Sequence, residues 1–150
     1  DYTTPINDLY WPMEVGNKWE YTNSNITYIN QSLEILSLDS SFQETYPVYI
    51  ASWYDIDVTS TISVYATESG LVKMDWTYRF NFNHGDSTGY NNEIVKISGD
   101  TMKFINESYI ESFVKNVGLV KVQYLRDGTQ IGSKHLKHAK IGGVVYNFSE

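Results

Sequence analysis

The stretch "YWPMEVGNKWEYT", residues 10–22, contains the first regular strand pattern in this chain. Trp19 and Tyr21 project to one side of an extended backbone, and the charged and Thr side chains that alternate with them project to the other. This alternation is typical of an antiparallel strand with one buried and one solvated face. Pro12 excludes regular sheet pairing before the strand, and Gly16 and Asn17 predict a turn that leads into it.

The same alternation recurs along the rest of the chain. Its clearest example is "VTSTISVYAT", residues 58–67, where Val, Ile and Ala side chains share one face. "SGD" at 98–100 predicts a tight hairpin, and so does "RDG" at 126–128, where Asp-Gly supplies the positive φ angles that a two-residue turn requires. From Ile26 we expect a long strand with a bulge or bend near 30–32. Further strand-like segments are 46–54, 71–80, 93–98, 101–105, 119–125 and 129–143.

About ten short strands joined by turns, without the spacing of βαβ units, predict an all-β fold. We expect a single curved antiparallel sheet, in the form of a half-barrel or an open barrel, with a sandwich as the alternative. Residues 1–16 form an N-terminal arm in this interpretation, and residues 17–150 form one β domain. The segment 107–117 has two interpretations, a strand or one short helix, because Ile110 and Phe113 belong to a set of apolar residues at helical spacing.

The composition agrees with a β-rich domain and excludes several classes of function. The chain has 150 residues, and 13 of its aromatic residues are Tyr, which suits half-buried strand surfaces. The absence of Cys excludes disulfides, thiolate zinc sites and thiol nucleophiles. The net charge of -7 argues against a nucleic-acid partner, since "KHLKHAK" at 134–140 is the nearest approach to a basic cluster and is short.

Two parts of the sequence resemble a group of bacterial secreted proteins and lipoproteins. "YWPMEVGNKWEY", residues 10–21, is similar to their opening motif, in which a Tyr-Phe/Trp-Pro-Leu stretch leads to Val-Gly-Asn and then Trp-x-Tyr. "NVGLVKVQY", residues 116–124, resembles their Val-Gly-Leu-Val-Lys strand, and "KHLKHAKIGG", residues 134–143, is a weaker third match. The resemblance implies a half-barrel β domain exported to the cell envelope. It carries over no catalytic residues, and we interpret the opening motif as structural, with Trp19 and Tyr21 in the core.

Localisation outside the cytoplasm is the expectation from these observations, in the periplasm, on the outer membrane as a lipoprotein, or in the medium. The sequence has no run of 18 apolar residues, so we expect no transmembrane segment. It begins at Asp1 rather than at a methionine, which is expected of a processed or trimmed chain that has lost an export signal. A lipid anchor before Asp1 in the full-length protein is part of the same expectation.

The histidines are the basis of a rival interpretation as a metal-dependent hydrolase. His84 and Asp86 lie in "NFNHGDSTGYNN", residues 81–92, and would have to meet His135 or His138. On a regular strand His135 and His138 would face opposite sides of the sheet, and only a bulge or a helix would place them together. We therefore assign no catalytic residues, no metal ligands and no cofactor.

The remaining signal is a group of aromatic residues in consecutive strands. On the concave face of a bent sheet they would offer a surface for an apolar ligand, a glycan or an envelope protein, with core packing as the alternative. Asp55 and Asp57 lie among them in "YDIDV" and are best explained as turn residues between two strands. The favoured function is a non-enzymatic binding domain, and the third possibility is a structural module of a larger surface protein. The candidate binding residues are Trp53, Tyr54, Tyr65, Trp76 and Tyr78.

Overall fold

The computed structural model describes residues 11–24, 26–39, 48–66, 72–74, 77–79 and 93–148. All regular structure in these ranges is β-strand. The strands are β1 (Lys18–Asn23), β2 (Gln31–Leu38), β3 (Val48–Asp55), β4 (Val58–Ala66), β5 (Val72–Met74), β6 (Thr77–Arg79), β7 (Ile94–Ser98), β8 (Thr101–Ile105), β9 (Tyr109–Val114), β10 (Gly118–Arg126), β11 (Thr129–Ile141) and β12 (Val144–Asn147).

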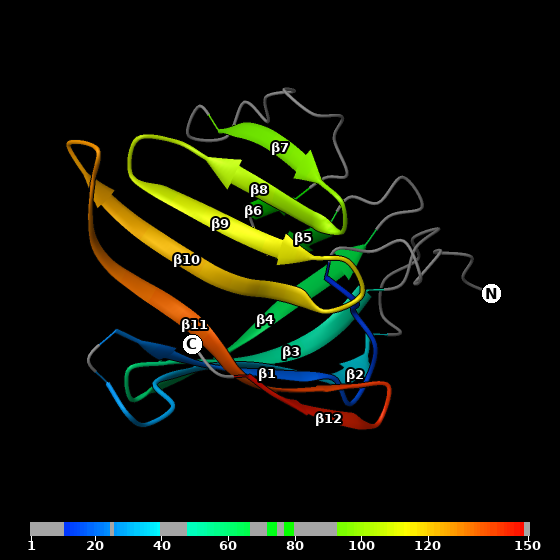
Figure 1. Cartoon of the computed structure of the whole chain (residues 1–150). Helices are drawn as coiled ribbons and strands as arrows, with labels where there is room; N and C mark the ends of the chain where they lie inside the picture. The colour runs from blue at the N-terminus through cyan, green and yellow to red at the C-terminus, as the bar shows by residue number, and fades with distance from the viewer. Residues whose placement is uncertain are drawn as a thin grey trace.

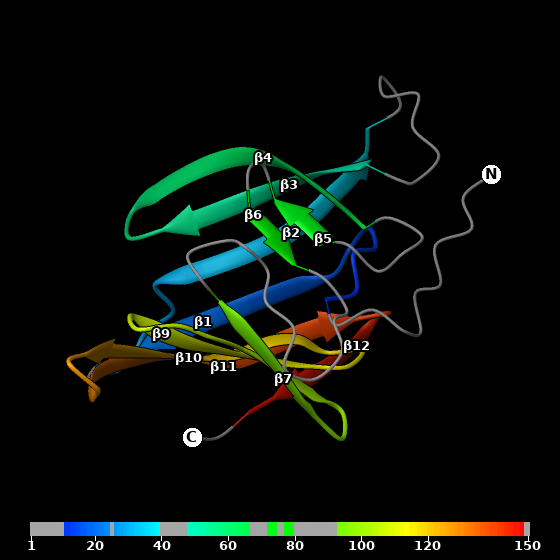
Figure 2. The same ribbon diagram turned by 90° about the horizontal axis from the view of Figure 1, so that it is seen from above.

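The strands form one antiparallel sheet in the order β6-β5-β4-β3-β2-β1-β11-β10-β9-β8-β7, and β12 pairs with β11 beside this path. The sheet bends strongly, so that β8 and β9 lie in front of β4, β5 and β6 in Figure 1, with the bend visible from above in Figure 2. No pairing between β6 and β7 closes the sheet among the described strands. The predicted all-β fold with a single curved sheet is therefore confirmed, with twelve strands instead of about ten.

The alternative of a short helix at 107–117 is wrong, because this segment contains β9. Glu111 and Phe113 of β9 pair with β8 on one side and with β10 on the other, so backbone hydrogen bonds to two neighbours fix the extended form. The apolar residues at helical spacing reflect instead a strand that places Phe113 in the core and Ile110 on the opposite face.

Two-residue turns set the register of the hairpins. The predicted turns at Gly99–Asp100 and at Asp127–Gly128 are confirmed, with φ of 58° at Gly99, 51° at Asp127 and 79° at Gly128. The β3–β4 turn has Ile56 and Asp57 at φ of 42° and 69°. Both turn positions are left-handed there, which matches the right-handed twist of the two strands although Ile rarely adopts this conformation.

Four irregularities in the pairing contribute to the curvature of the sheet. They lie in the pairs of β1 with β11, β2 with β3, β10 with β11 and β10 with β9. A bulge adds a residue to one strand and increases the local twist, which bends the sheet. The expected strand through residues 26–38 with a bend near 30–32 is corrected in detail: β2 begins at Gln31, and its irregularity lies between Ile35 and Ser37.

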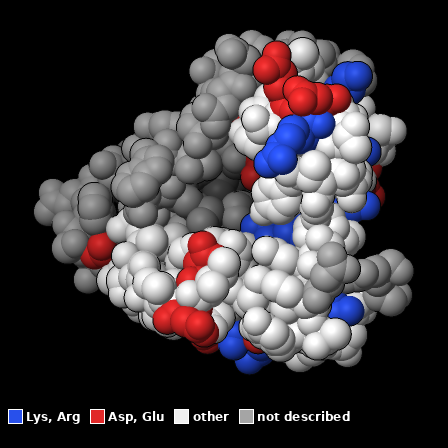
Figure 3. Space-filling view, turned by 90° about the vertical axis from the view of Figure 1, so that its left-hand side faces the viewer, with Lys and Arg blue, Asp and Glu red and all other residues white. Residues whose placement is uncertain are grey.

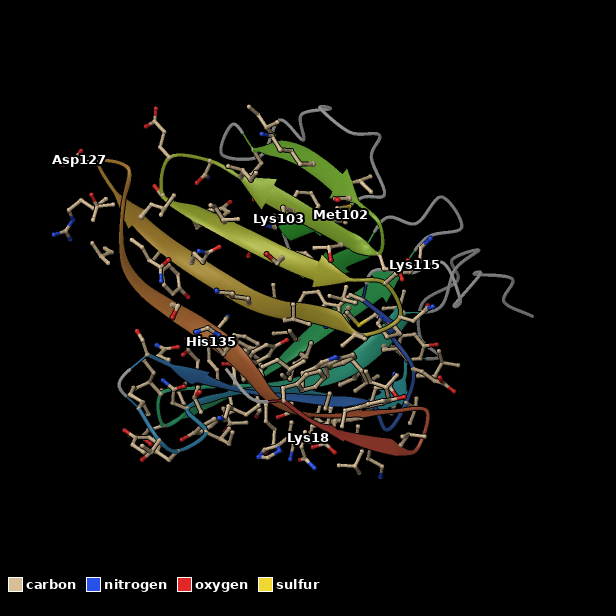
Figure 4. All side chains as sticks on the ribbon, viewed as in Figure 1. Lys18, Met102, Lys103, Lys115, Asp127 and His135 are labelled. Carbon is tan, nitrogen blue, oxygen red and sulfur yellow. The ribbon has the colours of Figure 1, made fainter. Side chains whose placement is uncertain are left out.

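The core lies on the concave side of the sheet, and the alternation along each strand decides which side chains reach it. On β8, Met102 is buried and Lys103 is exposed, and Figure 4 labels both residues. The residues before β1 also enter the core, since Trp11 packs edge-on against Trp19 with 6.1 Å between ring centroids and against Phe113 with 5.5 Å. Trp11 and Met13 of the opening segment therefore belong to the packed core, whereas Val15 is exposed.

The two stretches that carry the sequence resemblance meet in this core. The Trp19 indole N–H donates to the carbonyl of Val117 at 2.7 Å, and the Tyr21 hydroxyl donates to that of Leu119 at 2.8 Å. Gly118 lies between these two acceptors with φ of 117°, and a Cβ there would stand 2.6 Å from Trp11 Cδ1. Only glycine fits this position without a shift of its neighbours.

Asn17 explains why the turn before β1 is fixed. Its side chain is buried, donates from Nδ2 to the carbonyl of Pro12 at 3.0 Å and accepts at Oδ1 from the backbone N–H of Gly142 at 3.0 Å. It thereby connects the segment before β1 to the β11–β12 turn. Strand β12 was not foreseen in the sequence, because Gly142 and Gly143 read as the end of a strand instead of a turn into another.

Candidate functional site

The concave face carries several charged and polar side chains among its apolar ones. The antiparallel register pairs Lys134 of β11 with Asn23 of β1 and with Val122 of β10, and Val122 pairs with Glu111 of β9. Directly paired residues point to the same face. Because Val122 is buried in the core cluster, this row of side chains lies on the concave face.

A second set of concave residues comes from the other half of the sheet. Tyr21 of β1 pairs with Gln31 of β2, and Gln31 pairs with Asp55 at the end of β3. Trp53 lies two residues before Asp55 and therefore on the same face. We call Asn23, Gln31, Trp53, Asp55, Glu111, Tyr124 and Lys134 the concave polar cluster.

Lys134 is the most buried charged member of this cluster, with 7% of its surface exposed. Its ammonium lies 5.1 Å from the ring centroid of Tyr21 and 5.8 Å from that of Trp53, within the range of cation–π attraction. Within the described part of the chain, no hydrogen bond or ion pair reaches this ammonium. Aromatic faces thus take the place of the usual oxygen partners.

The electrostatic environment of Lys134 is set by burial and by two carboxylates. Burial lowers the pKa of Lys134 from 10.5 to about 8, and the negative charges of Glu111 and Asp55 oppose this shift. Burial and the Glu111 charge raise the pKa of Tyr21, and burial, Glu111 and Asp55 together raise that of Tyr124. Glu111 therefore acts on three neighbours across the concave face, which shows that these side chains share one electrostatic environment.

The neutral members of the cluster leave hydrogen-bonding capacity unused. Gln31 donates from Nε2 to Asp55 Oδ1 at 3.0 Å. The carboxamide oxygens of Gln31 and Asn23 are buried and accept no hydrogen bond within the described structure. Buried polar atoms are normally paired, so each of these two enclosed oxygens destabilises the folded chain.

Figure 3 shows the molecule from the end where the β3–β4 and β10–β11 turns lie, and a hollow opens in this surface between the two halves of the sheet. Basic and acidic side chains border the hollow. Trp53, Tyr124, Asp55 and Glu111 are each only partly buried, so this part of the concave face is in contact with solvent. Further into the sheet the same face closes into the core, where Trp19 and Phe104 have no exposed surface.

The aromatic residues that the sequence suggested do not form one surface. Trp53 lies in the concave polar cluster, but Tyr54 is the next residue on β3, faces the opposite side and donates its hydroxyl to Asp57 at 3.2 Å. The backbones of Tyr65 and Tyr78 belong to β4 and β6, and their side chains lie outside the described structure, as does the whole of Trp76. Trp53 is thus the one candidate whose side chain the structure places on the concave face.

The histidines are arranged differently from the expectation. His135 pairs with Thr22 and His138 with Glu20, so the bulge in β11 turns both rings to the convex face instead of opposite faces. Figure 4 labels His135 on β11. Each ring has another partner, Ser133 Oγ at 2.8 Å from His135 and Asn147 Oδ1 at 2.7 Å from His138.

A metal site is not assembled in the described part of the chain. No group of three or more His, Asp or Glu side chains there is placed to hold a metal ion. His84 and Asp86, the other members of the hypothetical hydrolase site, lie outside the described residues. The two histidines of β11 stand on the side of the sheet opposite to the concave polar cluster.

Sequence reasoning overlooked Lys134, which was considered only as part of a basic run. The alternation along β11 indicates its position, because Lys134 is two residues before Leu136 and so shares the face of Leu136, which points into the core. Gln31 and Glu111 were also missed. Their positions on the concave face depend on the pairing of strands that are distant in sequence.

No protein-family model and no curated protein matches the sequence. A solved structure from Parabacteroides distasonis ATCC 8503, described as a "putative lipoprotein", is similar with a TM-score of 0.49 and 11% sequence identity, over 93% of this chain and 99% of that chain. Among the described residues no helix is long and apolar enough to cross a membrane.

Proposed function

We propose that this chain is an exported, non-enzymatic binding domain that holds a small ligand on the concave face of its sheet, at the concave polar cluster. The observation that carries the proposal is that Trp53 and Tyr124 are partly exposed beside the partly exposed carboxylates of Asp55 and Glu111, on the face of the sheet that also carries the core. Ligand sites are typically concave and combine aromatic walls with a few polar groups, and this cluster has that composition.

The curvature of the sheet supports the same proposal. Residues from β1, β2, β3, β9, β10 and β11 converge on the cluster, although Tyr21 and Lys134 are far apart in sequence. Side chains held on paired strands keep their relative positions better than side chains on loops. A ligand in the hollow would therefore meet a largely pre-formed set of contacts.

The rival hydrolase has less support. His135 and His138 are on the convex face and bonded to Ser133 and Asn147, so they do not face the concave polar cluster. A general base or metal ligand must be within reach of the bound substrate. Export of the domain is supported by the sequence resemblance.

The test compares two neighbouring residues on β3. Trp53→Ala removes an aromatic side chain from the concave face, and Tyr54→Ala removes one from the opposite face as the matched control. Purified protein is examined by native mass spectrometry for retained ligand, and by titration with sugars and with long-chain fatty acids. We expect binding in the wild type and in Tyr54→Ala, and a loss of at least ~10-fold in affinity in Trp53→Ala.

Two results would contradict the proposal. One is the absence of any ligand or titratable binding in folded wild-type protein. The other is an equal effect of the two substitutions, since a site on the concave face depends on Trp53 and not on Tyr54. Export is tested separately by fractionation of cells that express the full-length gene, where recovery in the cytosol would refute it.

A further inference from the structure

The Lys134 ammonium is the strongest chemical feature of the concave face. An ammonium group has three donors, and burial without oxygen partners is costly. The aromatic rings of Tyr21 and Trp53 compensate part of this cost, but they accept no conventional hydrogen bond. A ligand oxygen that reached the ammonium would therefore form a charge-assisted hydrogen bond, which is stronger than one between neutral groups.

The surrounding charges restrict the class of ligand. Glu111 and Asp55 both act on Lys134 electrostatically, so the positive charge is already balanced by negative charge on the same face. An anionic ligand would be repelled by these carboxylates at short range. A purely apolar ligand would bury charged groups without giving them hydrogen bonds, which is also unfavourable.

A neutral polyhydroxyl ligand satisfies all of these conditions. Each hydroxyl both donates and accepts a hydrogen bond. It can accept from the Lys134 ammonium and donate to the partly exposed carboxylates of Asp55 and Glu111. The apolar C–H face of a sugar ring can pack against the partly exposed indole of Trp53.

We infer that the concave polar cluster binds one ring of a neutral sugar, with Lys134 as the central hydrogen-bond donor and Trp53 as the apolar platform. This inference rests on the proposed function, which it deepens by naming the ligand class. The inference names the class of ligand and not one glycan, because the cluster supplies hydrogen-bond donors and acceptors that the hydroxyls of different sugars can meet.

The experiment uses neutral oligosaccharides of glucose, mannose, galactose and xylose, with oleate as the competing ligand class. Binding is measured by isothermal titration calorimetry on the whole chain. Lys134→Met keeps the length of the side chain and removes its charge and donors. The control is Lys121→Met on β10, where Lys121 pairs with His135 on the convex face.

We expect at least one neutral oligosaccharide to bind the wild type and Lys121→Met equally, and to bind Lys134→Met at least ~10-fold more weakly. Circular dichroism verifies that Lys134→Met is folded. If Lys134→Met does not fold, the test uses Gln31→Met in its place. Ser32→Ala is then the control, because Gln31 and Ser32 lie on opposite faces of β2. We expect the same loss of affinity in Gln31→Met alone.

The outcomes separate this inference from the proposed function. If the chain binds oleate in a manner that depends on Trp53 but binds none of the sugars, the sugar inference is wrong and the concave binding site stands. Undiminished sugar binding in folded Lys134→Met, or in folded Gln31→Met where that pair is used, also overturns the inference. If neither sugars nor oleate bind, both the inference and the proposed function fail.

Discussion

Gly118 offers a direct test of how the core is assembled. It has φ of 117°, and a Cβ at this position would lie 2.6 Å from Trp11 Cδ1 and 3.0 Å from Trp19 Nε1. Gly118→Ala therefore combines backbone strain with overpacking of two indoles. Strain at a sparsely populated φ costs about 1–3 kcal/mol and overpacking about 1–3 kcal/mol. We expect the free energy of unfolding to fall by ~4 kcal/mol.

Gly128→Ala separates the two contributions. Gly128 also has a positive φ, of 79°, but nothing lies within 4 Å of the Cβ that the substitution would add. This control should lose only the backbone term, about 1–2 kcal/mol. Chemical denaturation followed by Trp fluorescence gives both free energies of unfolding, and the difference between the two variants reports the clash with the indoles.

The clash can be confirmed with a double-mutant cycle. In a Trp11→Ala background the Trp11 indole atoms that the new Cβ would meet are absent, so Gly118→Ala should cost less than in the wild type. Equal losses for Gly118→Ala and Gly128→Ala, or an unchanged cost of Gly118→Ala after Trp11→Ala, would refute the packing of Gly118 against Trp11. In either case the contact between the two resembling stretches would not limit stability.

Three further predictions concern other parts of the molecule. Tyr21→Phe removes the hydroxyl that bonds to the Leu119 carbonyl and should lower the free energy of unfolding by about 1–3 kcal/mol in urea denaturation; no loss would contradict the buried bond. Ile56→Asn should raise the free energy of unfolding by ~1 kcal/mol, because Asn tolerates the left-handed turn position better than Ile. Thermal denaturation tests this, and a lower melting temperature than the wild type would refute it. Burial lowers the pKa of Lys134 from 10.5 to about 8 in the folded chain, so the unfolded chain binds more protons between these pH values and stability rises with pH there. From pH 7 to 9.5 the free energy of unfolding should rise by about 2 kcal/mol as the buried ammonium loses its proton, and Lys134→Met should lack this rise. Equal pH profiles of stability for the wild type and Lys134→Met would refute the prediction.

Much of the fold follows from local patterns in the sequence. The alternation in "KWEYT" places Trp19 and Tyr21 in the core without knowledge of their partners, because successive side chains on a strand face opposite sides. The Asp127–Gly128 turn is equally local, since the two residues supply the backbone conformation that a tight hairpin needs. Errors arose where local signals were ambiguous, as at β9, whose apolar spacing fitted a helix until its pairing with β8 and β10 was known.

The candidate site was only partly predictable. Trp53 was identified from its place in an aromatic-rich strand, but Tyr54 was grouped with it although adjacent strand residues face opposite sides. His135 and His138 were expected on opposite faces, and a single bulge in β11 reverses this. A bulge depends on how two paired strands align, and no distinctive residue marks it in this stretch.

Local patterns were enough to predict the all-β class, the hairpin turns at 98–100 and 126–128, and the core positions of Trp19 and Tyr21, because side-chain direction repeats every second residue and turn chemistry is local. The contact of Lys134 with Tyr21 and Trp53, and the electrostatic effect of Glu111 and Asp55 on it, follow only from the folded sheet. These residues belong to strands that are brought together by the order of the sheet and by its bulges. Such long-range pairing depends on the balance of contacts over the whole sheet, which no short stretch of sequence encodes.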